Sequence, residues 1–438
     1  MTARQIALEV LTRVQKREGF IDNVLELTLR RYQLPERDER FVREITYGVT
    51  KLRKHLDYVL SQLIDRKKDR LVAREVLRIG AYQILFMDRV PDYAAINESV
   101  KLLKGEALGL AGFVNAVLRR LVRERGKIDF PDVTKNPVTF LSTFYSHPEW
   151  LIERWLHRYG YEETEQLCRV NNTPPQLCVR ANTLRISPLE LAAVFQKENV
   201  EAIPGRYADY VYYLNTSVPV GQLPSFRKGF FQIQDESAVL VGELLNARPT
   251  ERIVDLCASP GGKSTHLAQA TNDNGLIVAV DVSLTRLRPL VQNLRRLRIQ
   301  SICPVVSDSR YFQVKGCDGA LLDVPCSGTG TLRKRPDLRW RMSENEIREL
   351  TTLQLQLLEN AVSLLQVGGR LVYSTCSMEP EENEEVVSHF LSTHPNFVLD
   401  PIPDSFPKEL VRDGHYLSTL PHIHHVDGVF SCLLVRTG

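Results

Sequence analysis

Apolar residues recur at helical spacing through most of the first 125 residues of the chain. In the first stretch, Ile6, Val10 and Val14 follow one another at intervals of about one helical turn. Similar stretches begin near residues 24, 41, 71, 94 and 112. This period is typical of amphipathic helices. The pattern therefore predicts an all-α bundle over residues 1–128, in which we find no catalytic motif.

The helical period is lost over residues 129–149, which include three prolines, and we interpret this stretch as a linker. Beyond it, a helix is followed by two strands with a second helix between them. These elements are expected at residues 150–170, at 176–180 and 210–214, and from Ser187 onward. The mixture predicts a small α/β subdomain over residues 150–225.

From residue 226 to 438 short apolar runs alternate with helical patterns. The runs lie at residues 252–256, 276–280, 302–306, 320–322 and 370–373, and the helices near 264–270, 283–297, 344–365 and 380–393. Such alternation predicts a mainly parallel, doubly wound, Rossmann-like sheet. Ligands of these sheets bind at the carboxyl ends of the strands. The expected fold class is thus multidomain, with an α bundle, a small α/β subdomain and a larger α/β domain.

The composition of the 438 residues is that of a globular protein, with 43% hydrophobic and 25% charged residues, which excludes fibrous and mainly disordered chains. No apolar run approaches the roughly 18 residues of a membrane span. We also find no signal-peptide pattern. The expectation is a cytoplasmic protein with no membrane partner.

Charge divides unevenly along the chain. Residues 1–128 hold 26 Lys and Arg against 17 Asp and Glu, a net charge of +9, whereas the remainder holds 30 against 36, a net charge of −6. A basic bundle is typical of a module that binds a polyanion, and equally of a solvated helical surface. Charge alone leaves both interpretations open.

Eight cysteines are present, without a C-x-x-C pair or a histidine at zinc-finger spacing. The sequence therefore predicts neither a disulfide framework nor a metal site. Five of the cysteines have no polar loop around them and are expected to be packing residues. These five are Cys168, Cys178, Cys303, Cys317 and Cys432.

Four carboxylates stand at the ends of successive predicted strands: Asp255, Asp281, Asp308 and Asp323. A single aspartate after a strand is also a common helix N-cap. Four in succession indicate a ligand site, because the carboxyl ends of parallel strands share one edge of the sheet.

A glycine-containing loop follows the first of these strands. It consists of Cys257, Ala258, Ser259, Pro260, Gly261, Gly262 and Lys263. Its end fits the phosphate-binding pattern G-x-x-x-x-G-K-[ST], but cysteine occupies the position of the first glycine. A P-loop NTPase acting on RNA is therefore an alternative, although a triphosphate would face several carboxylates. S-adenosylmethionine (SAM) fits these acceptors better, because it offers a ribose diol, an adenine, an ammonium group and a cationic sulfonium.

Two cysteines lie in Ser/Gly/Thr-rich loops after predicted strands, Cys326 in Asp-Val-Pro-Cys-Ser-Gly-Thr-Gly and Cys376 in Tyr-Ser-Thr-Cys-Ser. A thiolate that adds to C6 of a pyrimidine makes C5 nucleophilic enough to accept a methyl group. A base must then remove the C5 proton so that the thiol can leave. Two thiols could divide this work, whereas the alternative is a pair of buried structural cysteines. These residues are compatible with either cytosine or uracil as the base that is methylated.

The same motifs carry a family resemblance. The stretches Asp-Leu-Cys-Ala-Ser-Pro-Gly-Gly-Lys, Asp-Val-Pro-Cys-Ser-Gly-Thr-Gly and Tyr-Ser-Thr-Cys-Ser resemble, in the same order, the RNA (cytosine-C5) methyltransferases of the NOL1/NOP2/Sun group. Ser259 departs from the alanine that is commoner there. Residues 37–49, 77–86 and 112–120 look like the NusB-like helical RNA-binding domain. Together the two halves are similar to bacterial 16S rRNA methyltransferases of that group.

The resemblance implies a role for each site residue. Cys376 would be the nucleophile, and Cys326 would assist proton removal and release. Asp281 would hold the ribose hydroxyls of SAM, Asp308 the adenine edge, and Asp323 the methionine end or the cytosine. Residues 257–263 would wrap the cofactor.

The implied partner is RNA, namely 16S rRNA before the subunit is fully assembled, with no DNA and with the enzyme as a monomer. A non-catalytic RNA-binding protein is the remaining alternative. We expect Arg119, Arg120 and Arg123 to lie on the face that contacts RNA, although a solvated helix surface explains them equally well.

Overall fold

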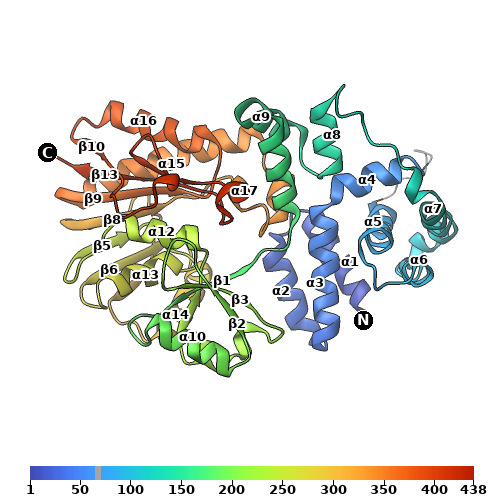
Figure 1. Ribbon diagram of the computed structural model, residues 1–438, viewed down its shortest axis with the longest axis horizontal. Coiled ribbons are helices and arrows are strands. Elements are labelled where there is room, and N and C mark those ends of the chain that lie inside the picture. The colour runs from blue at the N-terminus through green and yellow to red at the C-terminus, as the bar shows by residue number, and fades with distance from the viewer. Residues whose placement is uncertain (65–70) are drawn as a thin grey trace. The chain divides into compact units, whose positions relative to one another are not determined.

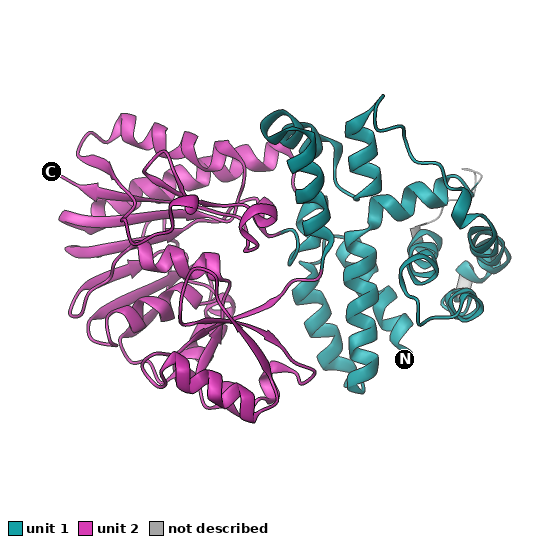
Figure 2. Cartoon of the chain, in the orientation of Figure 1, with its two compact units in different colours: residues 1–173, 332–341 teal, residues 174–331, 342–438 magenta. Residues whose placement is uncertain are grey.

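The computed structural model describes residues 1–64 and 71–438, which divide into two compact units (Figure 2). Unit 1 comprises residues 1–173 and 332–341, and unit 2 comprises residues 174–331 and 342–438. The segment 332–341 thus leaves the predicted catalytic half and becomes part of the helical unit. Unit 1 also extends beyond the end predicted for the bundle, because the helix expected at 150–170 packs with it.

Unit 1 is all-helical (Figure 1). Its helices are α1 (Ala3–Gln15), α2 (Ile21–Tyr32), α3 (Glu36–Lys51), α4 (Arg53–Ser61), α5 (Leu71–Phe86), α6 (Asp92–Val100), η2 (Gly105–Leu110), α7 (Ala111–Glu124), η3 (Arg125–Lys127), α8 (Pro137–Phe144), α9 (Glu149–Asn172) and η6 (Pro336–Trp340). One hydrophobic cluster joins α1 to α7. Ile6 and Val10 are completely buried in it, and Val14 packs against it, as the helical spacing predicted.

The stretch expected to be a linker contains α8. The Asn136 side chain accepts a hydrogen bond from the backbone N–H of Thr139 at 3.0 Å, and Pro137 occupies the first turn. Both are ordinary signals for the start of a helix. The interpretation of residues 129–149 as a linker is therefore wrong for 137–144, where one of the three prolines begins a helix.

The segment 332–341 is held in unit 1 by buried polar contacts. Arg339 is 1% exposed, and its Nη1 donates to the carbonyl oxygen of Ser146 at 2.9 Å and to Oδ1 of Asn172 at 3.0 Å. The indole N–H of Trp340 donates to the carbonyl oxygen of Thr50 at 2.6 Å. Thr50 lies in the last turn of α3, where carbonyl oxygens lack a donor within the helix, so Trp340 supplies that donor. Arg339 does the same for acceptors at the connection of α8 to α9 and at the end of α9.

Unit 2 contains a small antiparallel sheet in the order β2-β3-β1-β4. Its strands are β1 (Leu177–Ala181), β2 (Glu201–Pro204), β3 (Val211–Asn215) and β4 (Phe231–Ile233), and its helices are α10 (Pro188–Lys197), η4 (Val220–Gln222) and α11 (Pro224–Arg227). Ser187 caps α10 as predicted, in a capping box with Glu190. This sheet forms the core of the small α/β subdomain predicted over residues 150–225, although the helix expected at 150–170 packs in unit 1 and β4 lies beyond residue 225.

The larger sheet of unit 2 has nine strands, in the order β11-β12-β13-β9-β8-β5-β6-β7, with β10 paired to β13. The parallel strands are β5 (Arg252–Asp255), β6 (Leu276–Asp281), β7 (Ile302–Val306), β8 (Cys317–Asp323) and β9 (Leu365–Thr375). The antiparallel strands are β10 (Phe397–Asp400), β11 (Val411–Arg412), β12 (Tyr416–Thr419) and β13 (Val429–Arg436). The predicted doubly wound fold is confirmed.

Helices cover both faces of this sheet (Figure 1). One cluster contains α12 (Glu236–Leu244), α13 (Gly262–Ala270) and α14 (Leu284–Leu297), and the other contains α15 (Glu344–Leu364) and α16 (Glu384–Thr393). Shorter helices are η5 (Thr329–Thr331), η7 (Pro380–Glu382), η8 (Lys408–Leu410) and α17 (Pro421–His424). No helix among the described residues is long and apolar enough to cross a bilayer.

The antiparallel half of the sheet was not predicted. The strand β13 forms it by pairing with β9 in the register Ser431 to Ser374. Its residues 429–434 are all buried, so polar and apolar positions do not alternate along the strand. A buried run of this kind lacks the period by which strands are recognised.

Replacing Arg339 with methionine should lower the melting temperature of the protein by several degrees. The change leaves buried carbonyl oxygens without donors, at a cost of about 1–3 kcal/mol for each group. Scanning calorimetry of both variants measures the effect, with Arg335→Met as the control because Arg335 is exposed four residues earlier. Equal melting temperatures for the two variants would show that the segment is not anchored through Arg339.

Candidate active site

The predicted site residues gather at the carboxyl ends of the parallel strands in unit 2. Strand order runs β7-β6-β5-β8-β9, so the chain reverses its direction of winding between β5 and β8. Such a reversal point is where doubly wound sheets bind ligands. The loop after β5, the end of β8 and the loop after β9 all meet this edge.

The loop of residues 257–263 turns sharply into α13. Gly261 has a φ of +100°, and a Cβ atom added there would lie 2.4 Å from Cδ1 of Leu290. Only glycine fits this position without strain. The backbone N–H of Ala258 donates to the carbonyl oxygen of Val280 at 2.9 Å, which ties the loop to β6. The loop therefore presents its backbone at the end of β5, as a cofactor-wrapping loop requires.

Asp281 ends β6 beside this loop and is 3% exposed. Its Oδ2 accepts a hydrogen bond from the backbone N–H of Ser259 at 3.2 Å. Its Oδ1 lies 3.0 Å from Nε of Arg286, in a geometry that makes no hydrogen bond. An acceptor left without a donor in a buried position suits a ribose hydroxyl, which is the role implied by the resemblance.

Asp308 follows β7 and is paired with Arg310. Nη2 of Arg310 donates to Oδ2 at 2.6 Å, and Nε donates to Oδ1 at 3.0 Å. These hydrogen bonds lower the pKa of the Asp308 carboxyl. The group is thus an ionised acceptor, although part of its hydrogen-bonding capacity is already used by Arg310.

Asp323, at the end of β8, forms an ion pair with Lys263 from the loop after β5. The distance from Nζ to Oδ2 is 2.7 Å. Burial opposes the charge on Lys263, but the attraction of Asp323, Cys376 and Asp255 outweighs it and raises the pKa of Lys263. A lysine committed to a carboxylate in this way is poorly placed to receive a triphosphate, which argues against the P-loop alternative.

Cys326 and Cys376 face each other across the ends of β8 and β9. Their Sγ atoms are 3.2 Å apart, and the backbone N–H of Cys376 donates to Sγ of Cys326 at 3.3 Å. The hydrogen bond to Cys376 and burial raise the pKa of the Cys326 thiol. The raised pKa favours the protonated form of Cys326, and the two sulfur atoms lie close enough to share a proton.

A buried carboxylate that sequence reasoning missed joins the two cysteine loops. Glu382 is completely buried, and it accepts hydrogen bonds from the backbone N–H of Ser327 at 2.8 Å and from the Ser327 hydroxyl. The Ser327 hydroxyl lies 2.9 Å from that of Ser377. Because these serines follow Cys326 and Cys376 directly, Glu382 holds both loops. Its signal in the sequence was an acidic run just after the second cysteine motif.

Asp255, one of the four strand-end carboxylates, has a different environment. It is 1% exposed, and its Oδ2 accepts a hydrogen bond from the Ser264 hydroxyl at 2.6 Å. Burial raises the pKa of Asp255 to about 7. This aspartate lies beneath the loop and joins β5 to α13.

The remaining cysteines separate into two groups. Cys168, Cys178, Cys317 and Cys432 are buried, as predicted for packing residues. The prediction was wrong for Cys303, which is exposed. It lies on β7, the edge strand of the large sheet, where side chains can face solvent. No group of three or more His, Cys, Asp or Glu able to hold a metal occurs in the described part of the chain.

The arginines expected to contact RNA lie on α7 in unit 1. Arg119, Arg120 and Arg123 are all exposed. Nε of Arg120 forms an ion pair with Glu124 at 2.9 Å. Exposure is what either interpretation requires, so contact between these arginines and RNA stays a prediction.

Three family models match consecutive parts of the chain. The NusB family matches residues 1–123, the ferredoxin-like domain of RsmF/B-like methyltransferases matches residues 147–221, and 16S rRNA methyltransferase RsmB/F matches residues 242–435. One family model thus corresponds to the helical bundle, a second to the small sheet and a third to the large sheet.

Relatives match along nearly the whole chain. A probable ribosomal RNA small subunit methyltransferase B of Synechocystis is 38% identical over 98% of both chains. The corresponding protein of Bacillus subtilis is 33% identical over 100% of this chain and 99% of its own. The chain belongs to the RsmB/F family of 16S rRNA methyltransferases. The family expected from the motifs is confirmed.

Solved structures agree with this assignment. The crystal structure of PH0851 superposes with a TM-score of 0.82 at 27% identity and covers 100% of this chain and 99% of its own. A methyltransferase homologue from Pyrococcus horikoshii gives a TM-score of 0.60 at 27% identity, over 68% of this chain and 99% of its own. Membership of a SAM-dependent methyltransferase family also confirms the expected cofactor.

Replacing Glu382 with glutamine should speed alkylation of Cys326 by iodoacetamide several-fold at pH 8. The change removes a negative charge that raises the pKa of this thiol, and it removes an acceptor that holds the loop. Mass spectrometry of the labelled peptides measures the rate at each cysteine. The matched control is Glu385→Gln, since Glu385 is exposed. Equal rates in both variants would contradict the role given to Glu382.

Replacing Asp255 with asparagine should stabilise the protein more at pH 8 than at pH 5. The folded pKa of about 7 lies above the unfolded value of 3.8, so the folded state holds an additional proton between these values. The stability contributed by the neutral carboxyl is therefore lost as the pH rises towards 7. Melting temperatures of both proteins at the two pH values test this. A gain that is independent of pH would contradict a raised pKa.

Proposed function

We propose that the protein transfers the methyl group of SAM to C5 of cytosine in 16S rRNA, through a covalent bond between Cys376 and C6. The observation that carries this proposal is the pair of thiols 3.2 Å apart, at the same edge of the sheet as the ion pair of Lys263 with Asp323. A SAM-dependent methyl transfer to carbon needs an activated acceptor, and a thiol nucleophile provides one.

The cofactor site is built from the loop of residues 257–263, Asp281 and Asp308. The Oδ1 of Asp281, which accepts no hydrogen bond within the protein, and the ionised carboxylate of Asp308 supply acceptors for a ribose diol and an adenine amino group. Asp323 supplies a negative charge for the methionine end or an acceptor for the cytosine edge. When bound, SAM supplies an electrophilic methyl group.

The two thiols act in sequence in the proposed mechanism. The thiolate of Cys376 forms a bond to C6, and the electron pair that this places on C5 takes up the methyl group. Cys326 assists removal of the C5 proton, and the bond between Cys376 and C6 breaks as the ring double bond re-forms and Cys376 leaves as a thiolate. Cys326 is suited to these last steps, because its Sγ lies 3.2 Å from the departing sulfur and its raised pKa favours uptake of a proton.

The family model and the relatives carry the name of small-subunit rRNA methyltransferases, which supports 16S rRNA as the substrate. The choice of cytosine rests on the resemblance of the three sequence motifs to RNA (cytosine-C5) methyltransferases. The target base must leave its stack to reach the thiols, so unpaired rRNA that is not yet enclosed in the assembled subunit is the proposed substrate. The basic helical unit would bind the phosphate backbone. We further propose that the enzyme acts as a monomer, and its rRNA substrate would place it in the cytoplasm.

Replacing Cys376 with alanine should reduce methylation by at least a thousandfold and leave SAM binding unchanged, because only the nucleophile is lost. Transfer of radioactive methyl groups to 16S rRNA and calorimetric titration of SAM measure the two properties. The matched control is Cys303→Ser, since Cys303 is an exposed thiol away from the strand ends. Substantial methylation by the Cys376 variant would exclude the proposed nucleophile.

Replacing Cys326 with alanine should make a covalent RNA–protein adduct accumulate, because release from Cys376 is slowed. Denaturing gel electrophoresis detects the adduct, and the double variant lacking Cys376 should not form it.

Bisulfite sequencing of 16S rRNA from cells with and without the gene identifies the methylated base. An unchanged pattern of 5-methylcytosine would contradict the proposed function.

A further inference from the structure

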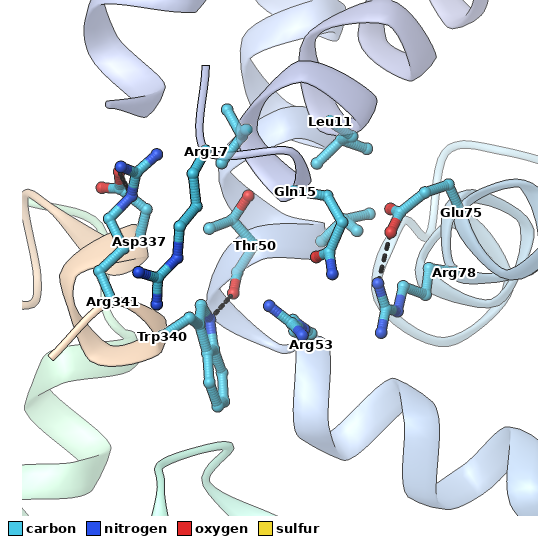
Figure 3. Close-up of a pocket in the computed structure, with 12 residues that line it drawn as sticks. Leu11, Gln15, Arg17, Thr50, Arg53, Glu75, Arg78, Asp337, Trp340 and Arg341 are labelled. Atoms are coloured by element: carbon cyan, nitrogen blue, oxygen red, sulfur yellow. Dashed lines mark hydrogen bonds and ion pairs between the residues drawn. The ribbon is translucent and has the colours of Figure 1, made fainter. Parts of the chain in front are cut away.

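Unit 1 contains a pocket of about 250 Å³ that none of the proposed catalytic steps uses. It is bordered by α1, the junction of α3 with α4, α5, and the segment 332–341 (Figure 3). Ligand pockets for drug-sized molecules begin at about 300 Å³, so this one suits a smaller group.

The walls of the pocket are rich in guanidinium groups. Arg17, Arg53, Arg78 and Arg341 line it, together with two carboxylates, Glu75 and Asp337. Figure 3 shows Arg17, Gln15 and Arg53 converging on the space beside Thr50 and Trp340. The lining therefore has a formal net charge of +2, which falls to +1 when Asp57 behind it is included.

Both carboxylates of the lining are already paired. Glu75 forms an ion pair with Arg78, which also binds Asp57 at 2.6 Å. Oδ2 of Asp337 accepts a hydrogen bond from the backbone N–H of Ile21 at 3.0 Å and lies 3.3 Å from Nε of Arg341. Each acid therefore has a cation of its own, and Glu75 and Asp57 attract Arg53 only at longer range, without an ion pair or a hydrogen bond to it.

Arg53 has no hydrogen-bond acceptor or ion-pair partner for its guanidinium group among the residues that the structure describes. Its Cζ lies 5.4 Å from the ring centroid of Trp340. Burial and the nearby charge of Arg78 lower the pKa of Arg53 by more than the attraction of Asp57 and Glu75 raises it, so its positive charge is only partly compensated. An arginine in this position gains most from an anion that accepts several hydrogen bonds at once.

We infer that this pocket binds a phosphate group, and that its occupant is a backbone phosphate of the RNA substrate. The second part of this inference rests on the proposed function. A phosphate is small enough for the pocket and complements Arg53 with several acceptor oxygens. The pocket wall includes Trp340, whose ring lies beneath the guanidinium group of Arg53.

The first experiment uses inorganic phosphate and the full chain. Phosphate should raise the melting temperature of the wild-type protein above that in chloride of equal ionic strength. Arg53→Gln should weaken phosphate binding at least tenfold, whereas Arg40→Gln should leave it unchanged. Arg40 is a matched control because it is exposed on α3 and loses the same charge. Equal stabilisation of wild type and Arg53→Gln, or none in either, would overturn the phosphate site.

The second experiment measures RNA affinity against salt concentration. Removing one phosphate contact should reduce the slope of log K against log salt by about 0.7–0.9. We expect this reduction in Arg53→Gln but not in Arg40→Gln, and Arg53→Lys should retain most of the slope. If Arg53 governs phosphate binding but not the slope, the occupant is free phosphate and the RNA assignment is overturned. The first experiment, with inorganic phosphate, requires no methylation of RNA. Its result is therefore independent of the proposed activity.

Discussion

The parallel pairing of β8 with β9 is the interaction on which the site depends. It sets Asp323 opposite Ser374, and the backbone N–H of Val324 continues the pairing by donating to Ser374 at 3.0 Å. Both strands therefore end at the same level, and the short loops after them bring two sulfur atoms from positions fifty residues apart to 3.2 Å. Glu382 holds the two loops together by accepting hydrogen bonds from Ser327 and Ser377, the residues that follow each cysteine.

This arrangement separates the chemical roles of two identical side chains. In isolation both thiols would titrate near the ordinary value. Their proximity makes loss of the first proton favour retention of the second, and the neighbouring Glu382 adds to this at Cys326. The lysine paired with Asp323 places positive charge near the other sulfur. One thiol is thereby suited to attack and the other to hold a proton.

The segment 332–341 connects two parts of unit 2 along the chain but packs in unit 1. It continues directly from the Cys326 loop and yet belongs to the helical unit, where Arg339 supplies donors to backbone carbonyl groups. Its anchoring creates one wall of the arginine-lined pocket. The basic charge of the first 128 residues thus has a specific place in the structure, beyond the exposed arginines of α7.

The sequence by itself determined the helical bundle, the parallel strands and the motif residues, because helical periods, apolar runs and strand-end aspartates are local features. It could not determine β13, whose buried run has no alternation, or α8, whose proline was read as a break. Nor could it show that Glu382 joins the cysteine loops, or that Arg53 has no ion-pair partner among residues 1–64 and 71–438. Those properties depend on which residues meet across long sequence separations, and only the tertiary structure decides that.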